Sequence, residues 1–119
     1  MNSGKTGEDA VCEYLKSMGY DVLNRNFHSR YGEIDVIAKV GECTVFVEVK
    51  TRKSTTYGTP AEFVTQSKMK KIIKTAMVYL GNQETEMRFD VAEVYMKDGR
   101  CEINYIENAF GGSYDIFSD

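Results

Sequence analysis

The residues best suited to chemistry are an acid and a lysine that share one face of a predicted strand, 43–51. Valines occupy every second position of this segment and form one face, so Glu48 and Lys50 point to the other. Charged side chains on a central, valine-rich strand are costly to bury unless they are paired or bind a metal ion. The pattern therefore predicts either a metal site or a structural ion pair between these two residues.

The preceding predicted strand brings a second acid to the same face if the two strands form a tight hairpin. A two- or four-residue loop centred on positions 41–42 places Asp35 opposite Glu48 and Glu33 opposite Lys50. A bulged three-residue loop would shift this register by one residue. Two carboxylates at ~4 Å repel by about 4 kcal/mol at an effective dielectric of 20, and a divalent cation converts that repulsion into affinity. Hard oxygen ligands, with no histidine or cysteine beside them, favour Mg²⁺ or Mn²⁺.

A helix expected over about 7–18 supplies a third acid. Glu8 lies three residues before Val11 and seven before Leu15, so it shares the buried stripe of this helix. We expect Glu8 to join the two carboxylates around one cation, directly or through water. The alternative is that Glu8 only accepts hydrogen bonds from first-turn amides, where acidic residues are favoured by the helix dipole.

Basic residues are concentrated in the middle of the chain, although the chain as a whole has a net charge of -3. Residues 50–74 contain seven lysines and arginines and a single acid, Glu62. Such a zone can attract phosphates, because the local field matters more than the net charge. The residues expected to contact nucleic acid are Arg52, Lys53, Lys68, Lys70, Lys71 and Lys74. The alternative is a solvated, lysine-rich helix face.

The second predicted helix, 66–80, places its lysines in two different positions. Lys68 falls at the border of the inner face, where it could reach the carboxylates, whereas the later lysines point outward. Glu33, Thr51 and Gln66 are expected to support the site from neighbouring positions.

The predicted elements place these residues in one domain of class α/β. At 119 residues the chain is long enough for a single modest core. The expected order is α-β-β-β-α-β-β, a mixed sheet flanked by helices, with a loosely ordered tail after about residue 111. Helices are expected at about 7–18 and 66–80, and strands near 20–27, 32–39, 43–51, 87–97 and 100–107.

Local signals predict where the helices begin and end. Thr6 and Asp9 have the spacing of a capping box, and Gly19 and Gly81 are expected to end the two helices. Residues 57–60 are expected to form a turn, followed by a short helical turn. The buried stripe of the first helix is expected to consist of Ala10, Val11, Tyr14, Leu15 and Met18.

The sequence lacks the features of an exported or membrane protein. Its first ten residues contain no apolar segment of a signal peptide, and no apolar run approaches the ~20 residues of a membrane span. Cys12, Cys43 and Cys101 are odd in number and include no CxxC pair. We therefore expect a cytoplasmic location, no membrane partner, and neither a disulfide nor a zinc site.

Two motifs on the predicted hairpin resemble the signature of PD-(D/E)XK nucleases. They are Gly32-Glu33-Ile34-Asp35 and, on the next strand, the seven residues FVEVKTR at 46–52. Nearly the entire chain is similar to the YraN family of proposed endonucleases, which is related to archaeal Holliday-junction resolvases. Shorter matches lie at residues 7–8, 25–26, 57–60, 68, 88–90 and 108–110. One departure is Ile34, which stands where the signature has proline.

The resemblance implies a restriction-endonuclease-like fold and metal-dependent hydrolysis of DNA phosphodiester bonds, in branched or damaged DNA. It implies that Asp35 and Glu48 bind Mg²⁺ or Mn²⁺, with the Val49 carbonyl as a further ligand. It also implies that Lys50 orients the attacking water and that Glu8 completes the acidic cluster. A homodimer is suggested as well. The alternative function is a non-catalytic nucleic-acid-binding or assembly module on a nuclease fold.

Two further residues have structural interpretations. Tyr31 could stack on a base, but an aromatic residue next to a strand is more often part of the core. Asp90, between Arg88 and Val91, is expected to anchor structure.

Overall fold

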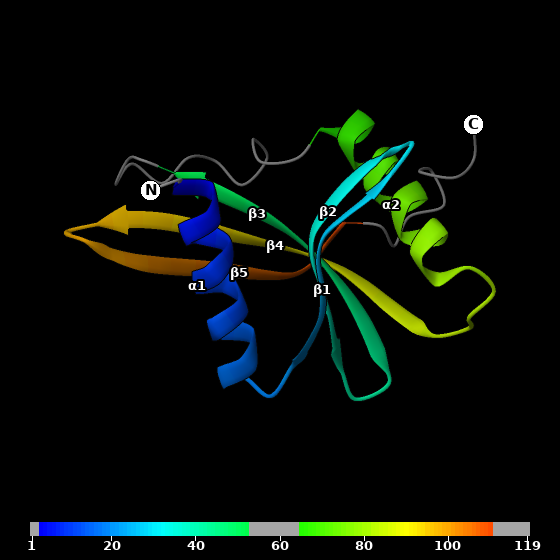
Figure 1. Cartoon of the computed structure of the whole chain (residues 1–119), viewed down its shortest axis with the longest axis horizontal. Coiled ribbons are helices and arrows are strands. Elements are labelled where there is room, and N and C mark those ends of the chain that lie inside the picture. Colours follow the sequence, from blue (N-terminus) through cyan, green and yellow to red (C-terminus); the bar gives the residue numbers. More distant parts are fainter. Residues whose placement is uncertain (1–2, 53–64, 111–119) are drawn as a thin grey trace.

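The structure, a computed structural model, describes residues 3–52 and 65–110 and has the predicted order of elements (Figure 1). The elements are α1 (Ser3–Ser17), β1 (Asp21–Ser29), β2 (Gly32–Val40), β3 (Cys43–Arg52), α2 (Gln66–Leu80), β4 (Glu86–Lys97) and β5 (Arg100–Phe110). The predictions for the turn at 57–60 and for the tail after residue 111 lie outside the described residues. No helix within the described ranges is long and apolar enough to cross a membrane.

The five strands form one mixed sheet in the order β1-β2-β3-β4-β5. β3 and β4 are parallel, and the other neighbouring pairs are antiparallel. A parallel pair needs a crossover connection, and α2 lies in the segment that joins β3 to β4. The predicted α/β class and mixed sheet are therefore confirmed.

Each helix covers one face of the sheet, and β3 contributes to both cores. Val45 and Val47 pack on the α1 side, whereas Phe46 between them packs on the α2 side. The α1-side core consists of Val11, Cys12, Leu15, Val36, Ala38, Val45, Val47, Ala92 and Val94. The α2-side core consists of Ile34, Ile37, Phe46, Ile72, Ile73, Ala76, Leu80, Phe89, Val91 and Phe110. Glu48 follows Phe46 on the α2 side, so the charged end of this face adjoins α2.

The first helix differs from its prediction at both ends. It begins at Ser3, so Thr6 lies inside the helix and the predicted capping box is wrong. The residues before Gly7 contain no proline and can continue the helix upstream. At the other end, Met18 follows the last helical residue and is 58% exposed, so its place in the buried stripe is also wrong. Cys12 is buried in the stripe instead.

Close packing holds the start of α1 against the sheet. A Cβ atom added at Gly7 would lie 2.7 Å from Thr51 Oγ1, so a side chain here would force Thr51 or α1 to shift. Gly7 therefore allows α1 to approach the end of β3. This contact gives Thr51 a packing role and places Glu8, the next residue, near the sheet.

The second helix has the predicted bounds and a cap that the sequence analysis missed. Thr65 Oγ1 accepts a hydrogen bond from the Lys68 amide at 3.2 Å, and Gly81 ends the helix with a positive φ of 59°. Thr75 is also buried, and its hydroxyl lies 2.9 Å from that of Ser29 on β1. The cap fixes Lys68 in the first turn, at the end of the helix beside the charged part of β3.

Candidate metal-binding and catalytic site

The β2–β3 hairpin has the predicted register. The pairs run from Val40 with Cys43 to Val36 with Val47, which is the register that points Asp35 toward Glu48. However, the described ladder ends at Val36, so the expected Asp35–Glu48 and Glu33–Lys50 strand pairs are not formed. Asp35 Oδ2 instead accepts a hydrogen bond from the Val49 amide at 2.8 Å. The side chain of Asp35 thus reaches β3 directly, where the backbone ladder stops.

An irregularity in β2 explains why the ladder stops there. Ile34 and Val36 should share a face in a regular strand, but Ile34 packs on the α2 side and Val36 on the α1 side. On the neighbouring strand β1, Asn26 has a positive φ of 53°. It lies between Arg25, which pairs with Val36, and Phe27, which pairs with Ile34. The alternation of side chains along β2 is therefore interrupted at Asp35. Before this residue, even-numbered side chains point to the α2 side, and after it they point to the α1 side.

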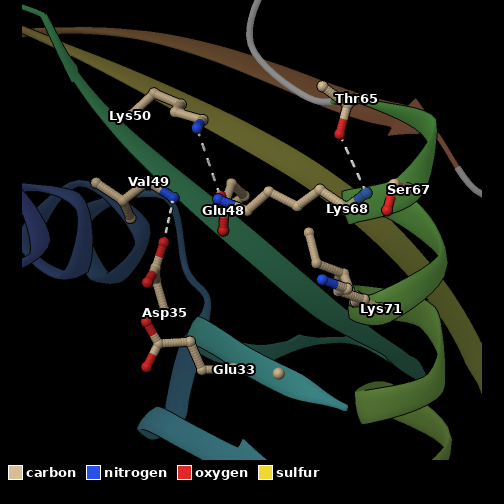
Figure 2. A pocket seen from close by; sticks show the side chains of 11 residues that line it. Glu33, Asp35, Glu48, Val49, Lys50, Thr65, Ser67, Lys68 and Lys71 are labelled. Atoms are coloured by element: carbon tan, nitrogen blue, oxygen red, sulfur yellow. Dashed lines mark hydrogen bonds and ion pairs between the residues drawn. The ribbon is translucent and has the colours of Figure 1, made fainter.

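Asp35 and Glu48 line one hollow of about 460 Å³ between the sheet and α2 (Figure 2). The remaining lining residues are Gly32, Glu33, Val49, Lys50, Thr65, Ser67, Lys68, Lys71 and Ile72. Burial raises the pKa of Asp35 to about 7, the charge of Glu48 adds to the rise, and the Val49 amide opposes it. The charged form of Asp35 is therefore unfavourable without a partner, and a nearby cation would stabilise it.

Two lysines reach Glu48 from different elements, Lys50 from β3 and Lys68 from α2, as Figure 2 shows. Glu48 is only 6% exposed, and its Oε2 lies 2.5 Å from Lys68 Nζ and 3.9 Å from Lys50 Nζ. Burial and the charge of Lys68 lower the pKa of Lys50. Burial opposes protonation of Lys68, but the hydrogen bond and charge of Glu48 raise its pKa overall. The predicted reach of Lys68 to the carboxylates is confirmed, and Glu48 is neutralised by two ammonium groups.

The third predicted acid lies apart from this hollow. Glu8 accepts a hydrogen bond from Asn26 Nδ2 at 3.2 Å, and Arg25 Nη2 lies 3.5 Å from the same carboxylate oxygen. Glu8 does not line the hollow, although its charge contributes to the raised pKa of Asp35. Within the described residues, no group of three acids, histidines or cysteines is close enough to hold a metal ion. A ligand role for Glu8 therefore stays a prediction.

The predicted basic residues fall into separate places. Arg52 lies on β3 beyond Lys50, and its Nη2 is 3.5 Å from Glu93 Oε2 on β4. Lys71 lines the hollow, whereas Lys74 is exposed further along α2, and Lys53 lies outside the described residues. The remaining predicted residues, Lys70 and Gln66, lie on α2 beside a neighbouring hollow.

Sequence reasoning missed several residues that contact the predicted site residues Glu8 and Arg52. Buried Glu93 accepts a hydrogen bond from Asn104 at 2.8 Å and lies beside Arg52. Arg25 and Asn26 hold Glu8, and the short match at 25–26 was a signal for this contact. No local pattern in the sequence marks Glu93, because its partners come from two other strands.

The donor set of the hollow fits a hard divalent cation. Asp35 and Glu48 supply carboxylate oxygens, and Mg²⁺ is commonly held by one or two carboxylates, with water and substrate phosphate completing its shell. The buried carboxylate of Glu48 already attracts two ammonium groups, those of Lys50 and Lys68, to its Oε2 atom. A cation at this point would offset the two effects that raise the pKa of Asp35, first its burial and then repulsion by Glu48. Among the described residues the structure brings together Asp35, Glu48, Lys50 and the backbone of Val49.

The metal-free protein should become less stable as pH rises from about 4 to about 7. The folded pKa of Asp35, about 7, is above the unfolded value of 3.8, so the native state holds a proton that the unfolded state releases. Asp35→Asn keeps an acceptor for the Val49 amide but removes the charge. In chelator at pH 8, we expect this variant to be more stable than wild type by about 4 kcal/mol, and the difference to vanish near pH 4. Urea unfolding at both pH values measures this; a variant less stable than wild type at pH 8 would contradict it.

The order of elements and the mixed five-stranded sheet define an α/β fold that is compatible with a restriction-endonuclease-like core. Comparison with known proteins then gives the family. The profile of the uncharacterised protein family UPF0102 matches residues 7–94. The chain belongs to the UPF0102 family, which is the YraN family that its motifs resemble.

Curated relatives match over almost their full lengths. A UPF0102 protein of Caldicellulosiruptor saccharolyticus is 46% identical over 112 residues, which cover 90% of this chain and 95% of the relative. A UPF0102 protein of Syntrophomonas wolfei is 44% identical over 110 residues, covering 90% and 96%. One from Persephonella marina is 44% identical over 114 residues, covering 93% and 95%. The names of these relatives state no activity.

Proposed function

We propose that this protein is a metal-dependent endonuclease that hydrolyses phosphodiester bonds in DNA. The observation that carries the proposal is the hollow in which Asp35 and Glu48 lie together while two lysines contact Glu48. Mg²⁺ or Mn²⁺, when bound to these carboxylates, would supply Lewis acidity, an activated water and a template for the phosphate. Such chemistry needs no covalent intermediate and therefore no nucleophilic serine or cysteine.

The protein's own groups have separate roles in this proposal. Asp35 and Glu48 hold the cation, with the Val49 carbonyl as a further ligand. Lys50 orients the attacking water and offsets the charge that develops at phosphorus. Lys68 reaches Glu48 from α2, and in this proposal it contacts the phosphate. Both ammonium groups already lie beside Glu48 when no substrate is bound, Lys68 Nζ at 2.5 Å and Lys50 Nζ at 3.9 Å.

A binding or assembly module without turnover is the second candidate. The basic residues on α2 would serve it equally well. Against it, a protein that only binds phosphates gains nothing from Asp35 and Glu48, since two carboxylates facing the substrate repel it. The presence of both acids beside Lys50 favours hydrolysis. Homodimer formation and a cytoplasmic location stay predictions.

The experiment that tests the function is cleavage of a panel of linear, flapped and four-way DNA substrates with Mg²⁺ or Mn²⁺. We expect the wild-type protein to cut at least one substrate, and chelation of the metal to stop cleavage. Asp35→Ala should remove the activity. If no substrate is cut, and Asp35→Ala binds DNA as well as or better than wild type, the binding module is the correct interpretation.

A further inference from the structure

A second hollow adjoins the candidate site, beside α2 and the turn between β1 and β2. Its volume is about 540 Å³, and it is lined by two polar residues of α2 and by Arg30, Tyr31, Lys70, Lys71 and Lys74. Ser67 and Lys71 line both this hollow and the one that contains Asp35 and Glu48. A polymer bound at the carboxylates could therefore continue into the second hollow, which we call the basic hollow.

Positive charge dominates the basic hollow. Four of its lining residues are lysine or arginine, and no acid is among the described residues that line it. Like charges around one concave surface repel each other, and together they attract anions to that surface. A bound polyanion would relieve this repulsion. By contrast, the neighbouring site balances Lys50 and Lys68 against Glu48.

Tyr31 holds two of these cations in place. Arg30 Nη2 donates a hydrogen bond to the Tyr31 hydroxyl at 2.7 Å, and the guanidinium carbon lies 4.9 Å from the ring centroid. The ammonium group of Lys74 lies 5.6 Å from the same centroid. Simple solvation would not require these contacts. Tyr31 organises cations here, whereas the sequence suggested base stacking or a core position.

We propose that the basic hollow is a phosphate clamp for an unpaired nucleic-acid strand that continues from the bond cut at the candidate site. Arg30 and Lys74 contact phosphates of this strand, and Tyr31 positions both. A flexible single strand can bend its backbone into a hollow, whereas the phosphates of a duplex are fixed on a stiff rod. The location of the cut bond rests on the proposed function; the strand-binding surface does not.

The test compares DNA binding by wild type and by an Arg30→Ala/Lys74→Ala double variant. Fluorescence anisotropy in chelator, so that nothing is cut, measures affinity for a duplex with an unpaired arm and for the same duplex with blunt ends. We expect wild type to prefer the armed duplex, and the double variant to bind it about 10-fold more weakly and to lose the preference. The slope of log affinity against log salt should fall by about 1.4, because each single-strand phosphate contact contributes about 0.7.

Matched variants separate the clamp from a general charge effect. Lys39→Ala/Lys97→Ala removes the same charge from exposed residues that do not line the basic hollow and should leave the arm preference unchanged. Tyr31→Ala should reduce the salt slope without removing any charge, because the two cations lose their positions. Tyr31→Phe keeps the ring and should restore most of the preference.

Each outcome decides the proposal. It is overturned if the Arg30→Ala/Lys74→Ala double variant binds both DNAs as wild type does, or weakens both equally. If no DNA is cut by wild type but the double variant loses the arm preference, the clamp stands and the nuclease proposal fails. If armed DNA is cut equally well by wild type and double variant, the nuclease proposal stands and the clamp fails.

Discussion

Glu48→Gln should fold, bind DNA in the absence of metal, and lose hydrolysis by about 10³-fold or more. The substitution keeps the size of a side chain that is only 6% exposed, and removes the charge that a cation and two lysines require. Loss of several kcal/mol of transition-state stabilisation corresponds to a rate change of this size. Steady-state cleavage rates in Mn²⁺, with thermal unfolding to verify the fold, make the measurement.

Glu33→Gln is the matched control for this prediction. Glu33 lines the same hollow, but its side chain is exposed and lies 3.2 Å from His28 on β1. A similar loss of activity in both variants would show only that negative charge near the hollow matters. Undiminished cleavage by Glu48→Gln would contradict the role given to Glu48.

Asp90→Ala should destabilise the protein by about 3–5 kcal/mol, which is the usual result of removing one partner from a buried charged pair. Asp90 is fully buried and accepts two hydrogen bonds from Arg88 Nε, at 2.9 and 3.2 Å, and one from Nη2 at 2.8 Å. It also accepts hydrogen bonds from the Tyr105 hydroxyl at 2.6 Å and the Asn108 amide at 2.8 Å. The variant leaves all of these donors without their acceptor.

Urea unfolding measures this effect, and Glu107→Ala is its control. Glu107 also lies near Arg88, at 4.0 Å, but its side chain is 64% exposed. We expect the control to change the free energy of unfolding by no more than about 0.5 kcal/mol. A loss below about 1 kcal/mol for Asp90→Ala would show that Arg88 and Tyr105 find other partners, and that the network does not hold β4 to β5.

Sequence periodicity predicted much of this framework because β3 and α2 are regular elements with strong patterns. Alternation along β3 separated the valines from Glu48 and Lys50, and helical phase placed Lys68 at the border of the inner face. Both predictions are confirmed in the structure. The anchoring role expected of Asp90 is confirmed by its buried hydrogen bonds.

The errors occur where the chain departs from regular geometry. A period of two cannot reveal that the alternation along β2 is interrupted at Asp35, so the contact with the Val49 amide was not foreseen. Met18 fits the stripe of a longer helix, but the helix ends at Ser17. The positions of Glu8 and Glu93 depend on partners from distant strands, and those contacts arise only in the folded protein.

The proposed function requires that Asp35 and Glu48 share one divalent cation. Titration of Mn²⁺ into the protein, followed by electron paramagnetic resonance of the free ion, measures this directly and needs no DNA substrate. We expect one bound Mn²⁺ per wild-type chain, and loss of that binding in both Asp35→Asn and Glu48→Gln, with Glu33→Gln unaffected. Absence of binding to wild type, or equal binding to all four proteins, would contradict it.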